Sequence, residues 1–156
     1  MERETVIIRP FQPKDQTATK QLILAGLADH WGILDPTLNP DLNNISHSYR
    51  DETFLLAIKD QEIVGCGALI TEDGERGNGR IMRMSVKKEN RRQGIGKLIL
   101  KHLETAAQMR GFTKIVLETT QTWHKAIAFY QTNGYQIIRQ WNGDTHFEKD
   151  IEASNI

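Results

Sequence analysis

The sequence lacks most features of secreted, fibrous and membrane proteins. Cys66 is the only cysteine in 156 residues, so no internal disulfide can form. Only four prolines are present, too few for a proline-rich or fibrous chain. No apolar run approaches the roughly 18 residues of a membrane span, and the first four residues, Met1-Glu2-Arg3-Glu4, do not resemble a signal peptide. We therefore expect a cytoplasmic protein.

The sequence also has no net charge. Lysine plus arginine and aspartate plus glutamate both number 20, which argues against a broad basic face for duplex nucleic acid. We expect no nucleic-acid partner and no membrane partner. The length is close to the roughly 150 residues of an average domain and predicts one domain over residues 1–156. The five histidines are dispersed and predict no metal site: His30, His47, His102, His124 and His146.

Apolar periodicity predicts an α/β (α+β) domain with one mixed sheet. We expect strands over residues 5–9, 53–59, 62–70, 80–86, 114–119, 135–139 and 145–151, and helices over 15–30, 95–110 and 123–133. Residues 33–50 are expected to be irregular, with one short helix after Asp41. Asp60-Gln61 predicts a two-residue hairpin turn, and Ile115-Val116-Leu117, apolar on both faces, predicts a strand in the middle of the sheet.

The most informative segment is Arg91-Arg92-Gln93-Gly94-Ile95-Gly96-Lys97, here called the phosphate loop, between a predicted strand and the longest predicted helix. Two glycines allow backbone amides to approach a ligand, and the first turn of a helix offers unpaired N–H groups. Five of the 20 basic residues fall within the eleven positions 87–97. This local excess of positive charge predicts a site for a pyrophosphate.

Two other phosphate-binding motifs do not fit. A dinucleotide-binding fingerprint needs a third glycine where Ile99 stands, and a P-loop needs serine or threonine where Leu98 stands. Gly-x-Gly by itself is also typical of an ordinary helix start with solvated charges. The sequence on either side of the loop is therefore needed to distinguish a phosphate site from a structural turn.

Those neighbours complete a family pattern. Met84-Ser85-Val86 followed by Arg91-x-x-Gly94-x-Gly96 resembles motif A of the GNAT superfamily of acetyl-CoA-dependent N-acetyltransferases. The segment Ala126 to Tyr135, with Tyr130-x-x-x-Gly134-Tyr135, resembles motif B of the same family. The resemblance implies a single GNAT-like domain, with a mostly antiparallel sheet of about seven strands and about four helices. It also implies acetyl-CoA as co-substrate, with no metal, and an amine-bearing acceptor.

The family's cofactor-binding residues carry over to the matching positions. In the family, the pantetheine arm of the cofactor pairs with the motif A strand, and the amides of the following loop hold the pyrophosphate. The implied cofactor-binding residues are Met84, Ser85, Val86, Arg91, Arg92, Gln93, Gly94, Ile95, Gly96 and Lys97.

Two residues are candidates for acid–base chemistry. An alkylamine arrives protonated at neutral pH, so a base must take a proton before the amine attacks. Glu118 closes a predicted central strand, where partial burial would make it a stronger base; a solvated glutamate, with water as the base, is the alternative. The resemblance places the general acid for the leaving thiolate at Tyr130, and a packing role in the core is the alternative.

The resemblance leaves the acceptor unidentified. Many relatives have asparagine where this sequence has Trp123, so this sequence departs from the family pattern on the substrate side of the site. The family selects its acceptor through regions that correspond to residues 26–50 and 136–147. Candidate contacts are His30, Trp31 and Arg83, although a surface salt bridge would equally explain Arg83. A non-catalytic acyl-CoA sensor and an interaction module on the same fold are alternative functions, and a homodimer is left open.

Overall fold

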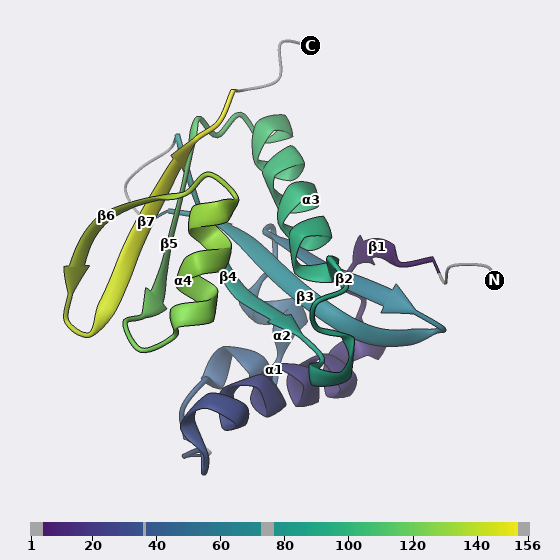
Figure 1. Cartoon of the computed structure of the whole chain (residues 1–156). Coiled ribbons are helices and arrows are strands. Elements are labelled where there is room, and N and C mark those ends of the chain that lie inside the picture. Colours follow the sequence, from purple (N-terminus) through teal and green to yellow (C-terminus); the bar gives the residue numbers. More distant parts are fainter. Residues whose placement is uncertain (1–4, 36, 73–76, 153–156) are drawn as a thin grey trace. The chain divides into compact units, whose positions relative to one another are not determined.

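The computed structural model describes residues 5–35, 37–72 and 77–152 (Figure 1). Within these ranges seven strands form one sheet in the order β1-β2-β3-β4-β5-β7-β6. The strands are β1 (Ile7–Pro10), β2 (Thr53–Lys59), β3 (Glu62–Thr71), β4 (Asn78–Val86), β5 (Lys114–Thr120), β6 (Gln136–Trp141) and β7 (Asp144–Asp150). The helices are α1 (Gln16–Trp31), α2 (Ile45–Ser48), α3 (Ile95–Met109) and α4 (His124–Thr132).

Strand pairing confirms the predicted class of fold. The β1–β2, β5–β7 and β6–β7 pairs are antiparallel, whereas β4 and β5 are parallel. The β4–β5 ladder joins Asn78–Arg80 to Lys114–Val116, the first residues of each strand. β5 lies between β4 and β7, as its apolar sequence predicts. The sheet is therefore mixed and mostly antiparallel.

The chain forms two compact units. The first contains the described part of residues 1–68 together with 83–103, and the second contains the described part of 69–82 and 104–156. Strands β3 and β4 and helix α3 each contribute residues to both units. The phosphate loop belongs to the first unit, and Glu118 and Tyr130 belong to the second.

In the first unit, glycines allow α3 to pack directly on β3. A Cβ atom at Gly65 would lie 2.8 Å from Cδ1 of Ile99, and one at Gly67 would lie 2.9 Å from Leu103 Cδ1. Helix α1 packs on the other face of the strands (Figure 1), where a Cβ atom at Gly26 would lie 2.9 Å from Ser85 Oγ. The part of α3 that holds Ile99 and Leu103 is therefore fixed by close contact with the sheet.

Both short hairpin turns have the backbone that a two-residue turn requires. Asp60 and Gln61 have φ values of 51° and 66°, and Asn142 and Gly143 have values of 55° and 84°. Two successive residues with positive φ define the type I′ turn, which matches the twist of the strands it joins. The turn predicted at Asp60-Gln61 is thus confirmed.

Residues 37–50 contain more regular structure than the sequence predicts. A 3-10 turn spans Pro40–Asn43 and helix α2 follows, where only one short helix was expected after Asp41. Leu42 and Ile45 are fully buried and fix this segment to the first unit. The loop expected over 72–79 lies partly outside the described residues, and β4 begins within it at Asn78.

Candidate functional site

The phosphate loop has a backbone suited to binding an anion. Gly94 has a φ of 81° and its carbonyl accepts the first hydrogen bond of α3, from Leu98 N at 3.0 Å. The amides of Ile95, Gly96 and Lys97 therefore stand in the first helical turn, where no intrahelical acceptor exists. Arg92 also has a positive φ, 65°, which is uncommon for a residue with a side chain. The partial positive charge of the helix start adds to that of the side chains.

Some side chains of the phosphate loop bind other parts of the protein, and others are exposed to solvent. Arg91 donates to Val86 O at 3.0 Å and pairs with Asp29 of α1 at 3.3 Å, whereas Gln93 accepts from Lys59 at 3.0 Å. Arg92 and Lys97 are exposed, and Ile95 points into the core with 2% of its surface accessible. Two cations are thus accessible beside the amides, and Ile95 offers a ligand only its backbone.

Strand β4 leads into this loop with an irregular backbone. Arg83 has a φ of 57°, which interrupts the regular strand before the motif A residues. A Cβ atom at Gly67 would meet Met84 Sδ, whereas Ser85 Oγ faces α1 at Gly26. Met84 and Ser85 therefore use their side chains for packing on opposite faces, and their backbone is what a ligand could pair with.

The side chain of Arg83 is bound to segment 33–50. Its Nη2 lies 2.7 Å from Asp41 Oδ1 and its Nε lies 3.0 Å from Oδ2, while Tyr49 donates to Oδ2 at 2.6 Å. The hydrogen bonds from Arg83 and Tyr49 hold the pKa of Asp41 below its usual value, despite its partial burial. The sequence allowed either an acceptor contact or a salt bridge for Arg83, and the structure shows a salt bridge with Asp41. The arginine ties the segment that includes α2 to β4.

His30 and Trp31, the other candidate acceptor contacts, end helix α1. Their rings meet edge to face with centroids 4.6 Å apart, and 54% of Trp31 is accessible. Ile33 and Leu38 are exposed nearby in the chain. The end of α1 and the residues after it thus present apolar surface, in the region where an acceptor was expected.

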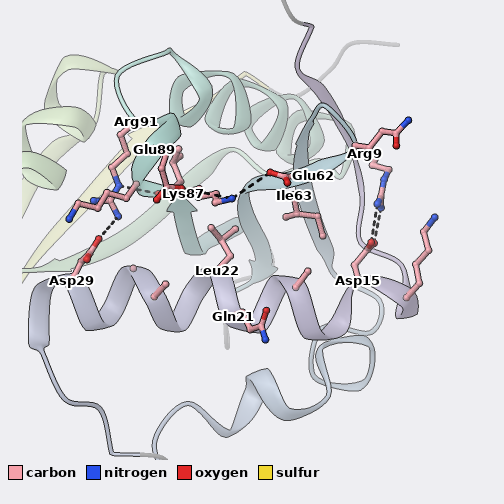
Figure 2. Close-up of a pocket in the computed structure, with 17 residues that line it drawn as sticks. Arg9, Asp15, Gln21, Leu22, Asp29, Glu62, Ile63, Lys87, Glu89 and Arg91 are labelled. Atoms are coloured by element: carbon pink, nitrogen blue, oxygen red, sulfur yellow. Dashed lines mark hydrogen bonds and ion pairs between the residues drawn. The ribbon is translucent and has the colours of Figure 1, made fainter.

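A cavity of about 710 Å³ lies in the first unit, and its lining residues are shown in Figure 2. Leu22 of α1, Ile63 of β3 and Val86 of β4 form its apolar part. Charged pairs surround it, including Arg9 with Asp15 at 2.7 Å and Lys87 with Glu62 at 3.5 Å. Its lining comes from segments distant in the sequence, so no local pattern predicts it.

Glu118 is more exposed than its place in a central strand predicts. Its side chain is 38% accessible, and its Oε2 accepts a hydrogen bond from Arg80 Nη1. Arg80 also binds Glu72, with Nη2 2.9 Å from Oε1. The partial burial expected for Glu118 is therefore replaced by an ion pair, which holds one carboxylate oxygen and fixes the direction of the other.

Tyr130 is buried in an aromatic cluster. Only 6% of the residue is accessible, and its ring centroid lies 5.1 Å from Phe129, 5.7 Å from Tyr135 and 5.8 Å from Phe147. Burial raises the pKa of the phenol above its ordinary value. The side chain thus has the packing role considered as the alternative, and it also keeps its proton over the neutral range.

Glu118 and Tyr130 lie on opposite faces of the second unit's part of the sheet. Phe147, which contacts Tyr130, pairs with Leu117 across the β5–β7 ladder, so α4 covers the face of Leu117. Glu118 is the next residue and its side chain leaves from the other face. The structure therefore does not bring the two candidate catalytic side chains into contact.

Comparisons with known proteins identify the family. Residues 20–135 of this chain match the model of the Acetyltransferase (GNAT) family. The chain belongs to the GNAT family. Probable N-acetyltransferase 14 of Xenopus tropicalis is 37% identical over 122 residues, which are 72% of this chain and 58% of that protein. N-acetyltransferase 8 of Homo sapiens is 31% identical over 113 residues, which are 69% of this chain and 50% of that protein. This GNAT chain thus spans about half the length of these curated relatives.

Solved GNAT structures share the fold. An acetyltransferase of the GNAT family from Staphylococcus aureus aligns with a TM-score of 0.83 at 25% identity, covering 95% of this chain and 100% of that chain. A PaiA N-acetyltransferase from Thermoplasma acidophilum, solved in complex with coenzyme A, aligns with a TM-score of 0.80 at 21% identity. The latter covers 94% of this chain and 99% of that chain.

Sequence reasoning missed two residues beside Glu118 in this GNAT chain. Arg80 is 38 residues away and reaches Glu118 through the parallel β4–β5 ladder. His146 is paired directly with Glu118 in the antiparallel β5–β7 ladder. A cross-strand register, which periodicity does not supply, is the signal that would have found both.

The described ranges contain no helix that could span a membrane and no group of side chains that could hold a metal ion. Across residues 5–35, 37–72 and 77–152, no helix combines the length and apolar character needed to cross a membrane. The same residues contain no group of three or more His, Cys, Asp or Glu side chains that could hold a metal ion.

Proposed function

We propose that this chain is an N-acetyltransferase, a single catalytic domain that moves an acetyl group from acetyl-CoA to a primary amine. The amine belongs to a small molecule, an amino acid, a peptide or a protein. The observation that carries the proposal is the phosphate loop, where Gly94 at a φ of 81° starts α3 and two cations flank open amides. Family membership and solved neighbours that contain coenzyme A or acetyl-CoA support it.

Binding of acetyl-CoA would use backbone more than side chains. We assign the pyrophosphate to the amides of residues 92–97, with Arg92 and Lys97 supplying charge. The backbone of Met84 and Val86 lies beyond the three-residue β4–β5 ladder. Its polar groups, other than Val86 O, which accepts from Arg91, are assigned to the pantetheine arm. Ser85, Arg91, Gln93 and Ile95 then shape and support the site, as their contacts on the protein side indicate.

The acetyl-transfer reaction needs a neutral amine, and Glu118 is the proposed base. Arg80 binds one oxygen of the carboxylate and leaves the other to accept a proton. The proton passes from the ammonium nitrogen of the acceptor to this second oxygen, and the freed amine attacks the thioester carbonyl. The exposure of Glu118 allows an acceptor in solution to reach it.

Tyr130 is the proposed general acid. As the thioester carbon–sulfur bond breaks, its hydroxyl gives a proton to the departing thiolate. Burial keeps the phenol protonated before that step, and three aromatic neighbours fix the ring.

The acceptor is proposed to bind at the end of α1 and in segment 33–50. His30 and Trp31 offer an aromatic surface there, and Arg83 holds the segment through Asp41 rather than facing an acceptor carboxylate directly. The apolar exposure of Trp31 favours an acceptor with an apolar group beside its amine.

The proposed activity is tested by thiol release. Purified protein is mixed with acetyl-CoA and a broad amine panel, and free CoA thiol is measured against Glu118→Gln and Tyr130→Phe variants. Amine-dependent thiol release by the parent, reduced in both variants, would support the proposal. Tight acetyl-CoA binding without thiol release for any amine would identify an acyl-CoA sensor instead.

A further inference from the structure

Two neighbouring residue pairs of the β5–β7 ladder contain buried polar atoms without hydrogen-bond partners. Four buried side-chain nitrogen or oxygen atoms in the described residues lack a hydrogen-bond partner, and three of them are Thr119 Oγ1, Thr145 Oγ1 and His146 Nε2. Thr119 pairs with Thr145, and Glu118 pairs with His146 in the adjacent rung. Buried polar atoms almost always have partners, so three unpartnered atoms in two rungs call for an explanation.

The two rungs present these groups on opposite faces of the sheet. Thr119 and Thr145 share the face of Leu117 and Phe147, which α4 covers. Glu118 and His146 share the other face, and the Cβ atoms of directly paired antiparallel residues lie about 4.5–5.5 Å apart. The side chains of His146 and Glu118, the proposed base, therefore leave the sheet next to each other.

Most of the charged groups around His146 other than Glu118 have contacts of their own. From β6, Arg139 pairs with His146 along the backbone, but its guanidinium lies over the Trp141 ring at 5.5 Å. On its own strand, Glu148 is bound to Lys114 at 3.4 Å, and Asp144 begins the strand. The Trp141 ring is 6.4 Å from the imidazole. Arg80, on the same face, is already bound to Glu72 and Glu118.

We propose that His146 is a further catalytic residue, which takes from Glu118 the proton that Glu118 receives from the acceptor amine. This inference rests on the proposed function. The proton moves from the ammonium nitrogen to the free carboxylate oxygen and then to His146 Nε2. The imidazolium later releases a proton from Nδ1 to water, and tautomer exchange through water restores the Nδ1–H form before the next turnover. The amine is left neutral, and Glu118 and His146 return to their starting states.

The hydrogen bond from Arg80 to Glu118 limits where a proton on Glu118 can go. The guanidinium occupies Oε2 of Glu118, so a proton accepted from the amine has to leave through the remaining oxygen. Imidazole is suited to receive it, because it gains and loses a proton near neutral pH and can do so at two different nitrogens. His146 Nε2, buried and unpartnered in the described structure, is the acceptor atom available there.

The test compares pH–rate profiles of kcat/KM for the parent, His146→Gln and Glu118→Gln. We expect His146→Gln to lower kcat/KM by about 10-fold or more near pH 7 and to change the shape of the pH–rate profile. Adding His146→Gln to Glu118→Gln should cause no further loss, because both act on one proton. His102→Gln is the matched control, since His102 lies on α3 with Nδ1 2.9 Å from Leu98 O, and should keep the parent rate.

A parent-like rate and pH profile in His146→Gln, or fully additive losses in the double variant, would overturn the relay. If His146→Gln does not fold, His146→Asn takes its place in the same comparison. A second readout does not need activity: the ring-proton NMR signals of His146 are compared between the parent and Glu118→Gln at one pH. A change at His146 without a change at His102 is expected; unchanged His146 signals would overturn the pairing even if no amine is acetylated.

Discussion

Arg80 binds Glu72 and Glu118 at the same time. Its Nη2 lies 2.9 Å from Glu72 Oε1, and its Nη1 donates to Glu118 Oε2. These carboxylates raise the pKa of the guanidinium further, chiefly through the hydrogen bond to Glu72, so its charge is permanent. Arg80 therefore holds the carboxylate of Glu118, the proposed base, and is itself held in place by Glu72.

Replacing Arg80 should misplace the base without removing it. We expect Arg80→Gln to lower kcat by about 10-fold with a small change in KM for acetyl-CoA, and Arg80→Lys to recover only part of the loss because lysine cannot hold two carboxylates in a planar fork. Steady-state kinetics at saturating acetyl-CoA measure both. A parent-like kcat in Arg80→Gln would show that this ion pair does not position Glu118.

Removing the carboxylate should have a larger and pH-dependent effect. Glu118→Gln is expected to reduce the rate by roughly 10²-fold at neutral pH, with a smaller deficit at alkaline pH, where the amine is already neutral. Rates measured from pH 6 to 10 with one amine test this. A variant that follows the parent at every pH would assign deprotonation to water or to another residue.

The phosphate loop depends on a backbone that only glycine adopts easily. Gly94 has a φ of 81°, so Gly94→Val should distort the start of α3 and abolish the rise in Tm that acetyl-CoA causes in the parent. Gly143→Val is the matched control, because Gly143 has a φ of 84° in the β6–β7 turn. The control should lose stability and still respond to acetyl-CoA. An equal response in Gly94→Val would remove the phosphate-loop assignment.

Replacing Tyr130, the proposed acid, should lower kcat, whereas replacing Arg92, the proposed phosphate contact, should lower the affinity for acetyl-CoA. Tyr130→Phe should lower kcat substantially and leave the Kd for acetyl-CoA within a few-fold of the parent, since it acts only as the thiolate leaves. Arg92→Ala should weaken acetyl-CoA binding, and less so at high salt, where the charge contact is screened. Should Tyr130→Phe lose affinity and stability together while kcat is kept, Tyr130 is a packing residue only.

A stability prediction concerns Asp15, of which 5% is accessible. Arg9 holds it at 2.7 and 2.9 Å, and this hydrogen bonding is the main reason its pKa lies below the usual value. A lowered folded pKa stabilises the fold above the ordinary value of about 3.9, and the stabilisation is lost as pH falls toward the folded pKa. Asp15→Asn should therefore cost about 1–3 kcal/mol of unfolding free energy at pH 7 and less at pH 3. Urea unfolding at both pH values measures this; a deficit independent of pH would mean that the charge is not involved.

Local sequence signals predicted the elements well because each depends on nearby residues. The turn at Asp60-Gln61 and the helix start at Gly94 follow from spacing and backbone preference. The contacts of Arg83 with Asp41, 42 residues apart, and of Glu118 with His146 depend instead on which strands and segments meet. Periodicity assigns a residue to a face but not to a partner across the sheet. The exposure of Glu118 was missed for that reason, since its apolar neighbours in sequence suggested burial.

Cys66 has a consequence for how this protein can be assayed. It is the only cysteine, it is fully buried, and its Sγ donates to Arg83 O at 3.1 Å. Burial raises the pKa of the thiol to about 12, so the thiolate that reacts with aromatic disulfide reagents is scarce at neutral pH. In the native protein such a reagent should therefore report CoA release without a background from the enzyme. One equivalent of protein thiol should become reactive only when the chain unfolds, which turns the same colour reaction into a measure of global opening.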